Sequence, residues 1–474
     1  MSKPRLFIPI TYHFSVRYII RTGLLKAILP FSQPVIGLGW ADEDLSRELQ
    51  DMGVEVVRLP LSQFGADYSR LRRQIDTWYY DYRLRTVSTA INERRKNIGL
   101  PLSALLIKHT RRLMHHLKLQ VPGAVSRMLA REERLVWEDT NLPENDAFIE
   151  KLNIQGVFSV TPYHREEELV LRAAAFRHIP VCTSIISFDN LTSRAWMPIL
   201  FDHYMVWNKY NRAELHRAYP ETVNRAVDIV GPVQFDFYWK PEYIWTEADW
   251  RKELSLPENR PVILYGGGPA AQIPQEPIFL QQIDQAISSG EIPGHPLILF
   301  RRHPVDSLER WQPVLQQCQH VFSDEPWSLG LLAPGNIYKF SNITDGDIAR
   351  LVSTLRHSDV HVSVCSTMAL DGAVFDKPQI GPAYDDTPAR RYDKSTRELY
   401  QKEHYLPIVH SGGISIAYSR DEMIKCIAIS MKEPQEKQHQ RQVMLNEICT
   451  FIDGHCTERV VQSMKSFLTA TSKN

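Results

Sequence analysis

The sequence predicts an α/β protein with two Rossmann-like domains, each built on a parallel sheet, and a helical C-terminus. Strand and helix patterns alternate over the first 60 residues and return beyond residue 156, which is typical of a doubly wound sheet. A second alternating series begins at residue 261. The chain of 474 residues is also too long for one ordinary domain.

The predicted domain limits follow from where this alternation stops. An N-terminal domain is expected over 1–231, with a helical insert over about 67–137, where long helical patterns replace the strands. Residues 232–260 are rich in proline and aromatic residues and carry little periodicity, so we interpret them as an interdomain linker. The C-terminal domain is expected over 261–474.

Apolar periodicity predicts the elements of each half in order. In the N-terminal half the expected strands are 5–11, 34–40, 54–59, 156–161, 181–187, 203–207 and 227–230, and the expected helices are 16–29, 42–52, 165–176 and 210–218. In the C-terminal half the expected strands are 261–265, 296–301, 361–364 and 379–381, the expected helices are 276–288 and 347–356, and 421–467 is largely helical.

Composition narrows the class of protein. Lysine and arginine together number 55, as do aspartate and glutamate, and this zero net charge argues against a nucleic-acid-binding protein. The six cysteines form no Cys-x-x-Cys pair, which argues against a zinc ribbon and suits a reducing compartment. The chain starts with a strand pattern rather than a signal peptide, and no apolar run approaches the ~18 residues that span a bilayer. We therefore expect a cytoplasmic protein.

The expected insert concentrates positive charge in this otherwise neutral chain. Between residues 67 and 134, fifteen lysine and arginine residues stand against six aspartate and glutamate residues. Helical spacing places leucines on one face and basic residues on another, namely Leu102, Leu105, Leu106, Leu113 and Leu117 against Lys108, Arg111, Arg112 and His115. Two interpretations remain open. The helix either packs on its domain with a solvated basic face, or meets anionic lipid at the inner face of a membrane or a lipid-diphosphate acceptor.

Three predicted strands of the C-terminal half end in residues that suit an anion. Gly266-Gly267-Gly268, Arg301-Arg302-His303-Pro304 and Cys365-Ser366-Thr367 each follow such a strand. Ligands of open parallel sheets bind beyond the carboxyl ends of strands, where glycine lets backbone amides approach and helix starts attract anions. Together the segments predict a diphosphate cradle, although a plain loop and a plain helix N-cap remain alternatives.

Longer motifs around these strand ends resemble a known family. Arg-Arg-His-Pro and, about sixty residues later, STMALDGAVFDKP resemble the C-terminal domain of GT-B fold glycosyltransferases of bacterial surface-polysaccharide biosynthesis, related to the CDP-glycerol glycerophosphotransferases. Asp453-Gly454 with TERV at 457–460 resembles the closing helix of these proteins. In the N-terminal half, SFDNLTSRA at 187–195 and FSVRYIIRTGLLKAIL at 14–29 resemble segments of related carbohydrate-biosynthesis proteins.

The resemblance implies a GT-B arrangement of two Rossmann-like domains facing a cleft. It implies that the C-terminal domain binds a nucleotide-diphosphate donor and that the N-terminal domain binds the acceptor. His303, Ser366 and Thr367 would contact the donor diphosphate, and Arg302 would add charge beside them. Asp371 stands where many of these proteins carry a ribose- or sugar-binding glutamate with a longer side chain.

The function expected from the resemblance is transfer of a sugar from a nucleotide-diphosphate donor to a glycan or lipid-linked acceptor in surface carbohydrate assembly. The alternatives are a CDP-glycerol-type polyol-phosphate transferase, a nucleotide-sugar 2-epimerase and a non-enzymatic glycan-assembly scaffold. An inverting transfer needs a base, for which Asp189 and His13 are the candidates and His164 is a third.

Metal-independent chemistry is expected, with the nucleotide-sugar as a co-substrate and no further cofactor. Asp345-Gly346-Asp347 matches the Asp-x-Asp motif of metal-dependent sugar transferases, but it directly precedes a helical run. We therefore interpret these aspartates as helix-capping residues rather than metal ligands.

Overall fold

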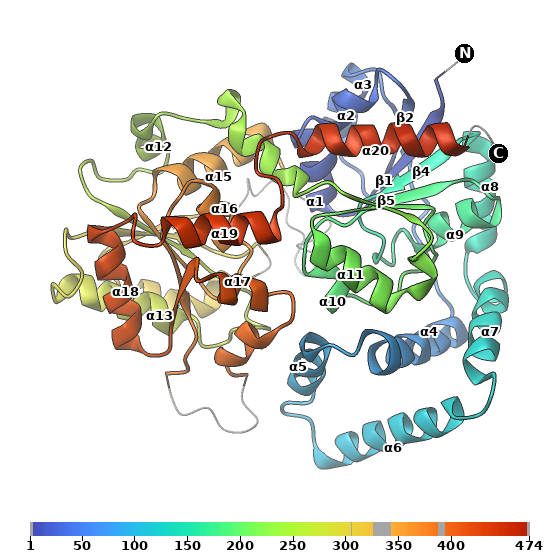
Figure 1. The fold of residues 1–474 in the computed structure, drawn as a ribbon, viewed down its shortest axis with the longest axis horizontal. Coiled ribbons are helices and arrows are strands. Elements are labelled where there is room, and N and C mark those ends of the chain that lie inside the picture. The colour runs from blue at the N-terminus through green and yellow to red at the C-terminus, as the bar shows by residue number, and fades with distance from the viewer. Residues whose placement is uncertain (1–2, 305, 326–342, 387–393, 472–474) are drawn as a thin grey trace. The chain divides into compact units, whose positions relative to one another are not determined.

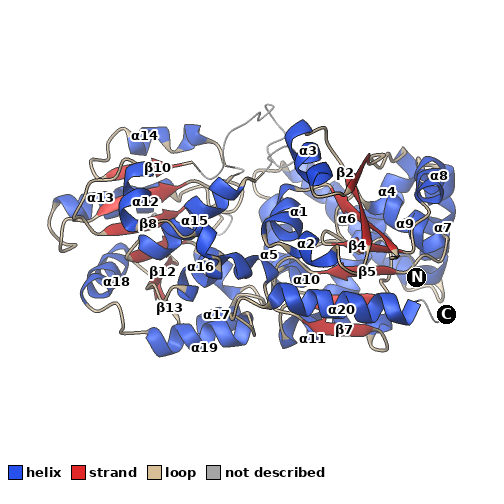
Figure 2. Ribbon diagram, turned by 90° about the horizontal axis from the view of Figure 1, so that it is seen from above, coloured by secondary structure: helices blue, strands red, loops and turns tan. Residues whose placement is uncertain are grey.

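The structure is a computed structural model that describes residues 3–471 apart from 305, 326–342 and 387–393 (Figure 1). It divides into two compact units, the first made of Met1–Val230 with Thr457–Asn474 and the second of Gly231–Cys456. Each unit holds one sheet whose neighbouring strands pair in parallel. Figure 2 shows the strands of each sheet in red with helices packed around them in blue. The predicted α/β fold with two Rossmann-like domains is confirmed.

The sheet of the first unit has seven strands in the order β3-β2-β1-β4-β5-β6-β7. Its central strands are apolar runs covered on both faces, as parallel strands between helices must be. All seven predicted strands are present, as β1 (Arg5–Ile10), β2 (Gln33–Leu38), β3 (Glu55–Arg58), β4 (Gly156–Ser159), β5 (Val181–Ser184), β6 (His203–Val206) and β7 (Ala226–Ile229). The connecting helices are α1 (His13–Val16), α2 (Leu24–Ile28), α3 (Glu43–Asp51), α8 (Leu142–Leu152), α9 (Glu168–Phe176), α10 (Asn190–Ser193) and α11 (Lys209–Ala218).

The expected helical insert lies between β3 and β4. Arg72 and Glu132, near its two ends, form a buried ion pair at 3.0 Å, and Glu132 also pairs with Arg172 of α9 at 2.5 Å. These contacts join the two ends of the insert to each other and to α9, whereas the longest helix of the insert, α6, has no buried residue. The insert consists of α4 (Ala66–Trp78), a π-helical segment (Tyr79–Leu84), α5 (Val87–Lys96), α6 (Leu102–Leu119) and α7 (Ala124–Glu138). None of the described helices is long and apolar enough to span a bilayer.

The sheet of the second unit has six strands in the order β10-β9-β8-β11-β12-β13. Four of them were predicted, namely β8 (Val262–Gly266), β9 (Leu297–Arg301), β11 (Val360–Ser363) and β12 (Gln379–Pro382). The two edge strands β10 (Val321–Asp324) and β13 (Ile414–Ala417) were not, because each has only four residues, of which at most two are buried, and this gives too short a pattern. The helices of this unit are α12 (Glu247–Glu253), α13 (Pro277–Ser288), α14 (Gln312–Leu315), α15 (Asp345–His357), α16 (Met368–Val374), α17 (Leu406–Ser411), α18 (Arg420–Lys432) and α19 (Gln438–Ile448).

Two segments lie in a different unit from the one their sequence suggested. Residues 232–260, expected as a linker, fold into the second unit because most of their aromatic side chains are buried there; Trp250, for example, donates to Thr354 at 3.1 Å. The last helix, α20 (Cys456–Thr471), expected within 261–474, packs on the first unit. There the Ser463 hydroxyl donates to Asp228 of β7 at 2.7 Å. These contacts correct the predicted domain limits.

Candidate functional site

The three predicted anion-contacting segments of the second unit follow three neighbouring strands. In the register of the sheet, Gly266 at the end of β8 pairs with Arg301 of β9 on one side and with Ser363 of β11 on the other. The carboxyl ends of these strands are therefore level. The segments that follow them meet at one edge of the sheet, as expected for a ligand site of this class of fold.

The glycine turn contributes space at this edge rather than free amides. The Gly267 amide donates to the carbonyl of Arg301 at 2.9 Å, and the Gly268 amide donates to the Glu276 carboxylate at 2.8 Å. A Cβ at Gly266 would lie 2.6 Å from the Met368 sulfur, and one at Gly267 would lie 3.2 Å from both Phe300 and Trp311. The expectation that these two amides face a ligand is corrected, because the fold already uses them.

The structure contains a buried ionic cluster behind the glycine turn, which the sequence did not predict. Glu276 is completely buried and pairs with Arg310 at 3.1 Å, and Arg310 also pairs with Asp306 at 2.6 Å. Burial raises the pKa of Glu276 to about 7, against the opposing effects of the Gly268 amide and of Arg310. The cluster holds the turn after β8 against the segment after β9. Only the i,i+4 spacing of Asp306 and Arg310 hinted at it.

His303 follows β9 and is half-buried at the sheet edge. Burial lowers its pKa to about 4, and Arg302 and Arg310 act in the same direction while Asp306 opposes them. At pH 7 its ring is therefore neutral and offers one N–H donor and one acceptor. The neighbouring Arg302 is already engaged, because its guanidinium pairs with Glu325 at 2.5 Å and donates to the carbonyl of Asp306.

The turn after β11 is fixed by two tyrosines. Cys365 has a left-handed backbone with φ of 44°, and its amide donates to the Tyr400 hydroxyl at 3.1 Å. The Tyr405 hydroxyl donates to the carbonyl of Ser366 at 3.3 Å. The Ser366 hydroxyl accepts from the Met368 amide at 3.2 Å, whereas the Thr367 side chain is exposed and makes no cap hydrogen bond. The turn thus presents the Thr367 hydroxyl to solvent at the sheet edge.

Three of the sequence candidates in this unit have roles within the fold. The buried Asp371 carboxylate accepts a hydrogen bond from Tyr238, so it is turned toward the 233–239 segment rather than grouped with His303 and Thr367. Thr344 and Asp347 form a capping box at the start of α15, and Asp345 accepts from Tyr243 at 2.8 Å. The capping interpretation is confirmed for Asp347, whereas the bond from Tyr243 gives Asp345 a partner outside the helix start. No cluster of metal-ligating side chains is present among the described residues.

In the first unit, candidate bases follow β1 and β4, which are neighbours in the sheet. His13 is buried at the start of α1, and the Tyr12 ring contacts it at 4.5 Å and His164 at 4.7 Å between ring centroids. The structure therefore groups His13 with His164 around Tyr12.

Next to this group lies Glu167, a buried carboxyl that sequence reasoning missed. Its carboxylate accepts hydrogen bonds from Thr11 at 2.6 Å, Thr161 at 2.5 Å and Ser159 at 2.8 Å. Burial raises the pKa of Glu167 to about 7, although the three hydroxyl donors lower it. A glutamate inside a run of three, HREEE, gave no signal that set it apart from a solvated residue.

Asp189 follows β5 and is held in a turn. Its carboxylate accepts from the Ser187 hydroxyl at 2.5 Å and from the side-chain amide of Asn190 at 3.3 Å. The Ser193 hydroxyl lies 3.4 Å from the same carboxylate. Asp189 is half-exposed and is separated from His13 by the width of β4 in the sheet order.

Known proteins match this chain at the level of family and fold. The family model of CDP-Glycerol:Poly(glycerophosphate) glycerophosphotransferase matches residues 194–466, more than half of the chain. Among curated proteins no match was found. The UDP-GlcNAc 2-epimerase of Neisseria meningitidis, solved with UDP-GlcNAc, is 12% identical with a TM-score of 0.53 over 98% of this chain and 100% of its own. MnaA of S. aureus, solved with UDP, is 10% identical with a TM-score of 0.54 over 99% and 97%.

The wall teichoic acid polymerase TagF is 14% identical over 69% of this chain and 76% of its own, with a TM-score of 0.42. At such identities the likeness to solved structures concerns the fold, and the GT-B fold expected from the motifs is confirmed. The family follows from the match that spans both units of the structure. The chain belongs to the CDP-glycerol:poly(glycerophosphate) glycerophosphotransferase family.

Proposed function

We propose that this chain moves glycerol phosphate from CDP-glycerol to the hydroxyl end of a polyol-phosphate chain. The observation that carries the proposal is the family match over residues 194–466, which includes every strand of the second sheet. It favours polyol-phosphate transfer over the sugar transfer expected from the motifs. The likeness to 2-epimerases concerns the fold and gives no argument for epimerisation.

In this reaction the acceptor oxygen bonds to the phosphorus that carries glycerol. The bond from that phosphorus to the bridging oxygen of the diphosphate breaks, and CMP leaves with the electron pair. Negative charge therefore grows on the departing phosphate, where preorganised donors stabilise the transition state. The acceptor hydroxyl loses its proton to a base.

We propose that the donor diphosphate binds at the sheet edge of the second unit. The neutral ring of His303 and the hydroxyls of Ser366 and Thr367 would donate to it, supported by their places after neighbouring strands. Arg302 would act at longer range, since Glu325 already pairs with it. In the first unit, Asp189 or His13 would take the acceptor proton.

Product analysis separates the possible reactions. The purified chain is incubated with CDP-glycerol or with UDP- and GDP-sugars, together with a glycerol phosphate oligomer, and the released nucleotide is identified by chromatography. We expect CMP from CDP-glycerol, in an amount equal to the glycerol phosphate added to the oligomer. Release of UDP or GDP with sugar transfer would restore the sugar-transferase interpretation. Release of CMP without oligomer extension would mean hydrolysis.

Removal of divalent metal is expected to leave this CMP release unchanged. Asp345 and Asp347, which resemble an Asp-x-Asp motif, are engaged in hydrogen bonds at the start of α15. The assay is repeated after dialysis against EDTA. A loss of activity that magnesium or manganese restores would contradict this expectation.

We further propose that the outer face of α6 binds the surface of an anionic membrane. Its leucines are exposed by 84% at Leu102, 73% at Leu106, 60% at Leu113 and 56% at Leu117. Soluble monomers rarely expose so continuous an apolar stripe, and an amphipathic helix with basic flanks is typical of membrane-surface binding. The surrounding excess of lysine and arginine in the insert suits anionic lipid.

Vesicle flotation tests this face. We expect the chain to float with anionic vesicles, less with neutral ones, and less as salt rises. The variant L106S/L113S is expected to lose most of this binding, whereas L61S/V223S, which changes exposed apolar residues elsewhere in the first unit, keeps it. Equal recovery with neutral and anionic vesicles, or equal loss in both variants, would contradict the proposal.

A further inference from the structure

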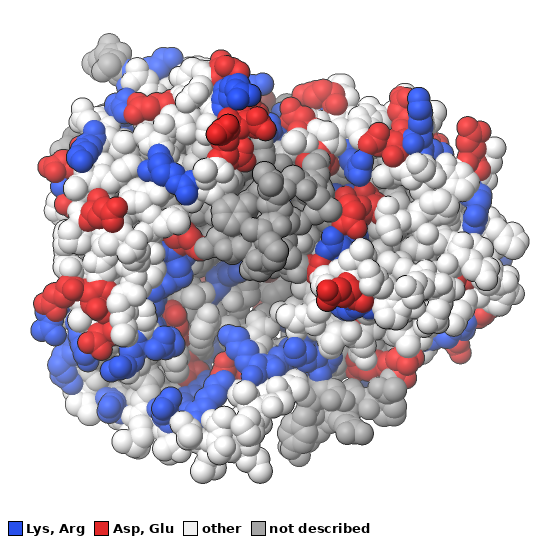
Figure 3. Space-filling view, turned by 180° about the vertical axis from the view of Figure 1, so that it is seen from behind, with Lys and Arg blue, Asp and Glu red and all other residues white. Residues whose placement is uncertain are grey.

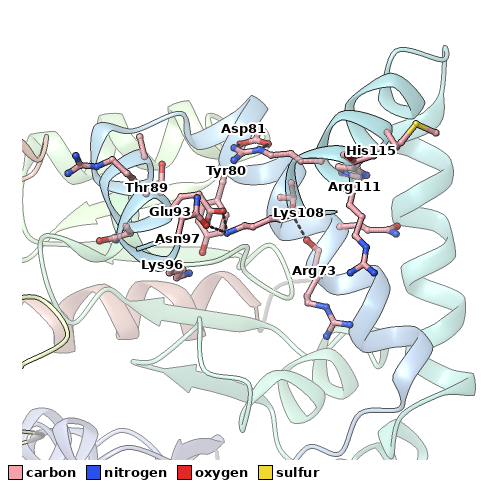
Figure 4. Close-up of a pocket in the computed structure, with 18 of the residues that line it drawn as sticks. Arg73, Tyr80, Asp81, Thr89, Glu93, Lys96, Asn97, Lys108, Arg111 and His115 are labelled. Carbon is pink, nitrogen blue, oxygen red and sulfur yellow. Dashed lines mark hydrogen bonds and ion pairs between the residues drawn. The ribbon is translucent and has the colours of Figure 1, made fainter. Parts of the chain in front are cut away.

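An open cavity of about 1660 Å³ lies between α4, the π-helical segment, α5 and α6 of the insert (Figure 4). This exceeds the ~300–1,000 Å³ of pockets for drug-sized ligands, so the space suits an extended molecule. Nine lysine and arginine residues line it, against two acidic residues. The cations are Arg70, Arg73, Arg85, Arg94, Lys96, Lys108, Arg111, Arg112 and Lys118.

Both acidic residues of the cavity are already paired. Asp81 bonds to Arg112 and, at 2.7 Å, to His116, and Glu93 pairs with Lys108 at 2.7 Å. Within the part of the chain that the structure describes, five lining cations have no acidic partner, namely Arg73, Arg85, Lys96, Arg111 and Lys118. Like charges gathered without counter-charges raise the local positive potential and attract a polyanion.

The side chains converge from different helices. In Figure 4 the guanidinium groups of Arg73 and Arg111, from α4 and α6, extend to the same side of the cavity. Figure 3 shows lysine and arginine side chains, in blue, gathered over the lower part of the molecule where the insert lies. Neutral donors stand between the cations, among them Thr89 and Asn92 of α5. Guanidinium groups suit phosphates, and these hydroxyl and amide groups suit the free hydroxyls of a polyol.

The cavity and the exposed leucines belong to opposite faces of α6. At 100° per residue, Leu102, Leu106 and Leu113 fall within one sector of the helix, and Arg111 and Lys118 fall on the other side. None of the exposed leucines lines the cavity. A bilayer on the leucine face therefore leaves the cations of the cavity to a soluble ligand.

One end of the cavity reaches the turn that holds the candidate base. Ser193 lines the cavity, and its hydroxyl lies 3.4 Å from the Asp189 carboxylate. Thr86 of the cavity wall donates to the carbonyl of Thr192 in the same turn at 2.9 Å. A chain held by the cations can thus present its end to Asp189.

We propose that this cavity binds the phosphodiester groups of the polyol-phosphate acceptor and directs its terminal hydroxyl toward Asp189. The inference rests on the proposed function for the identity of the chain. It adds a binding site within the first unit, distinct from the donor site of the second unit, that recognises the acceptor by its repeating negative charge.

The test compares two double charge reversals with the same change in net charge. R73E/R111E alters the cavity, whereas R127E/R131E alters exposed arginines of α7 that do not line it. Binding of a fluorescent glycerol phosphate hexamer is measured by anisotropy, and binding of CDP is measured by calorimetry. Thermal unfolding checks that both variants are folded.

We expect R73E/R111E to bind the hexamer roughly tenfold or more weakly, with CDP binding unchanged and R127E/R131E close to the parent chain. Hexamer binding by the parent should weaken as salt rises. Equal loss in both variants would reduce the effect to net charge and overturn the proposal. Hexamer binding retained by R73E/R111E would also overturn the proposal. Loss of flotation with anionic vesicles in the same variant would then make the cavity a membrane surface. The hexamer-binding assay contains no CDP-glycerol. If the product assay showed no CMP release, the proposed function would therefore be contradicted while the hexamer-binding result stayed the same.

Discussion

His303→Ala and Thr367→Ala are each expected to lower kcat/KM by about tenfold or more while the chain stays folded. A hydrogen bond to a charged group contributes ~1.5–3 kcal/mol, which corresponds to roughly ten- to hundredfold in rate. The charge on the leaving phosphate grows in the transition state, so losing His303 should lower kcat more than donor affinity. Steady-state kinetics of CMP release measure both constants.

The double variant adds a second criterion. If both residues act on one diphosphate, their combined loss should differ from the sum of the single losses. His439→Ala provides a matched control, because His439 is an exposed histidine of α19 in the same unit. Wild-type turnover and wild-type CDP binding in both single variants would place the donor elsewhere.

Glu132→Ala is expected to destabilise the first unit by about 3–5 kcal/mol, the usual cost of removing one partner from a buried ion pair. Glu132 pairs with Arg72 at 3.0 Å and Arg172 at 2.5 Å, and all three side chains are almost completely buried. The variant leaves both arginines facing a gap. Urea unfolding at pH 7 measures the change in the free energy of unfolding.

Glu133→Ala is the matched control for this change, because Glu133 is the exposed neighbour of Glu132 on the same helix. It is expected to alter stability by less than about 0.5 kcal/mol. Similar losses in the two variants would mean that helix propensity, and not the buried cluster, sets the effect.

Glu168 belongs to the same cluster, since it pairs with Arg172 at 3.4 Å and with Arg72 at 3.8 Å, and it predicts how the stability of the fold depends on pH. Burial alone would raise the pKa of Glu168, but Arg72, Arg172 and Arg165 lower it from 4.5 to about 2. A carboxyl whose folded pKa lies below its unfolded value stabilises the fold above pH 4.5 and loses this effect as the pH falls toward 2. Urea unfolding between pH 6 and pH 3 should therefore show falling stability for the parent chain. Glu168→Gln should show a smaller slope.

Local sequence patterns were sufficient for most of the architecture. The alternation of strands and helices identified all seven strands of the first sheet and four of the second, because burial between helices makes the central parallel strands largely apolar. The capping role of Asp347 was also local, since a cap and its helix lie within a few residues. The choice of His303, Ser366 and Thr367 as donor residues was also local, because each lies within a few residues of the end of a strand, and their role stays a prediction.

Such local patterns could not predict the long-range partners of these residues. The Gly268 amide donates a hydrogen bond to Glu276, and Arg302 pairs with Glu325. The Asp371 carboxylate accepts a hydrogen bond from Tyr238, 133 residues away. In each case a group that we expected to contact a ligand is bonded within the fold. Periodicity shows that a residue is buried or exposed on an element, but it carries no information on which distant element packs against it.

The same limit explains the insert and its cavity. The sequence determined that α6 carries leucines on one face and cations on another, because helical geometry fixes that separation. Whether the leucines pack on the domain depended on how α4 and α7 pack into the core of the first unit. Arg72 of α4 and Glu132 of α7, 60 residues apart, also bond to each other there. Tertiary packing left the leucines exposed and turned the cations toward the cavity, because residues of α4 and α7 enter the core of the first unit whereas no residue of α6 is buried.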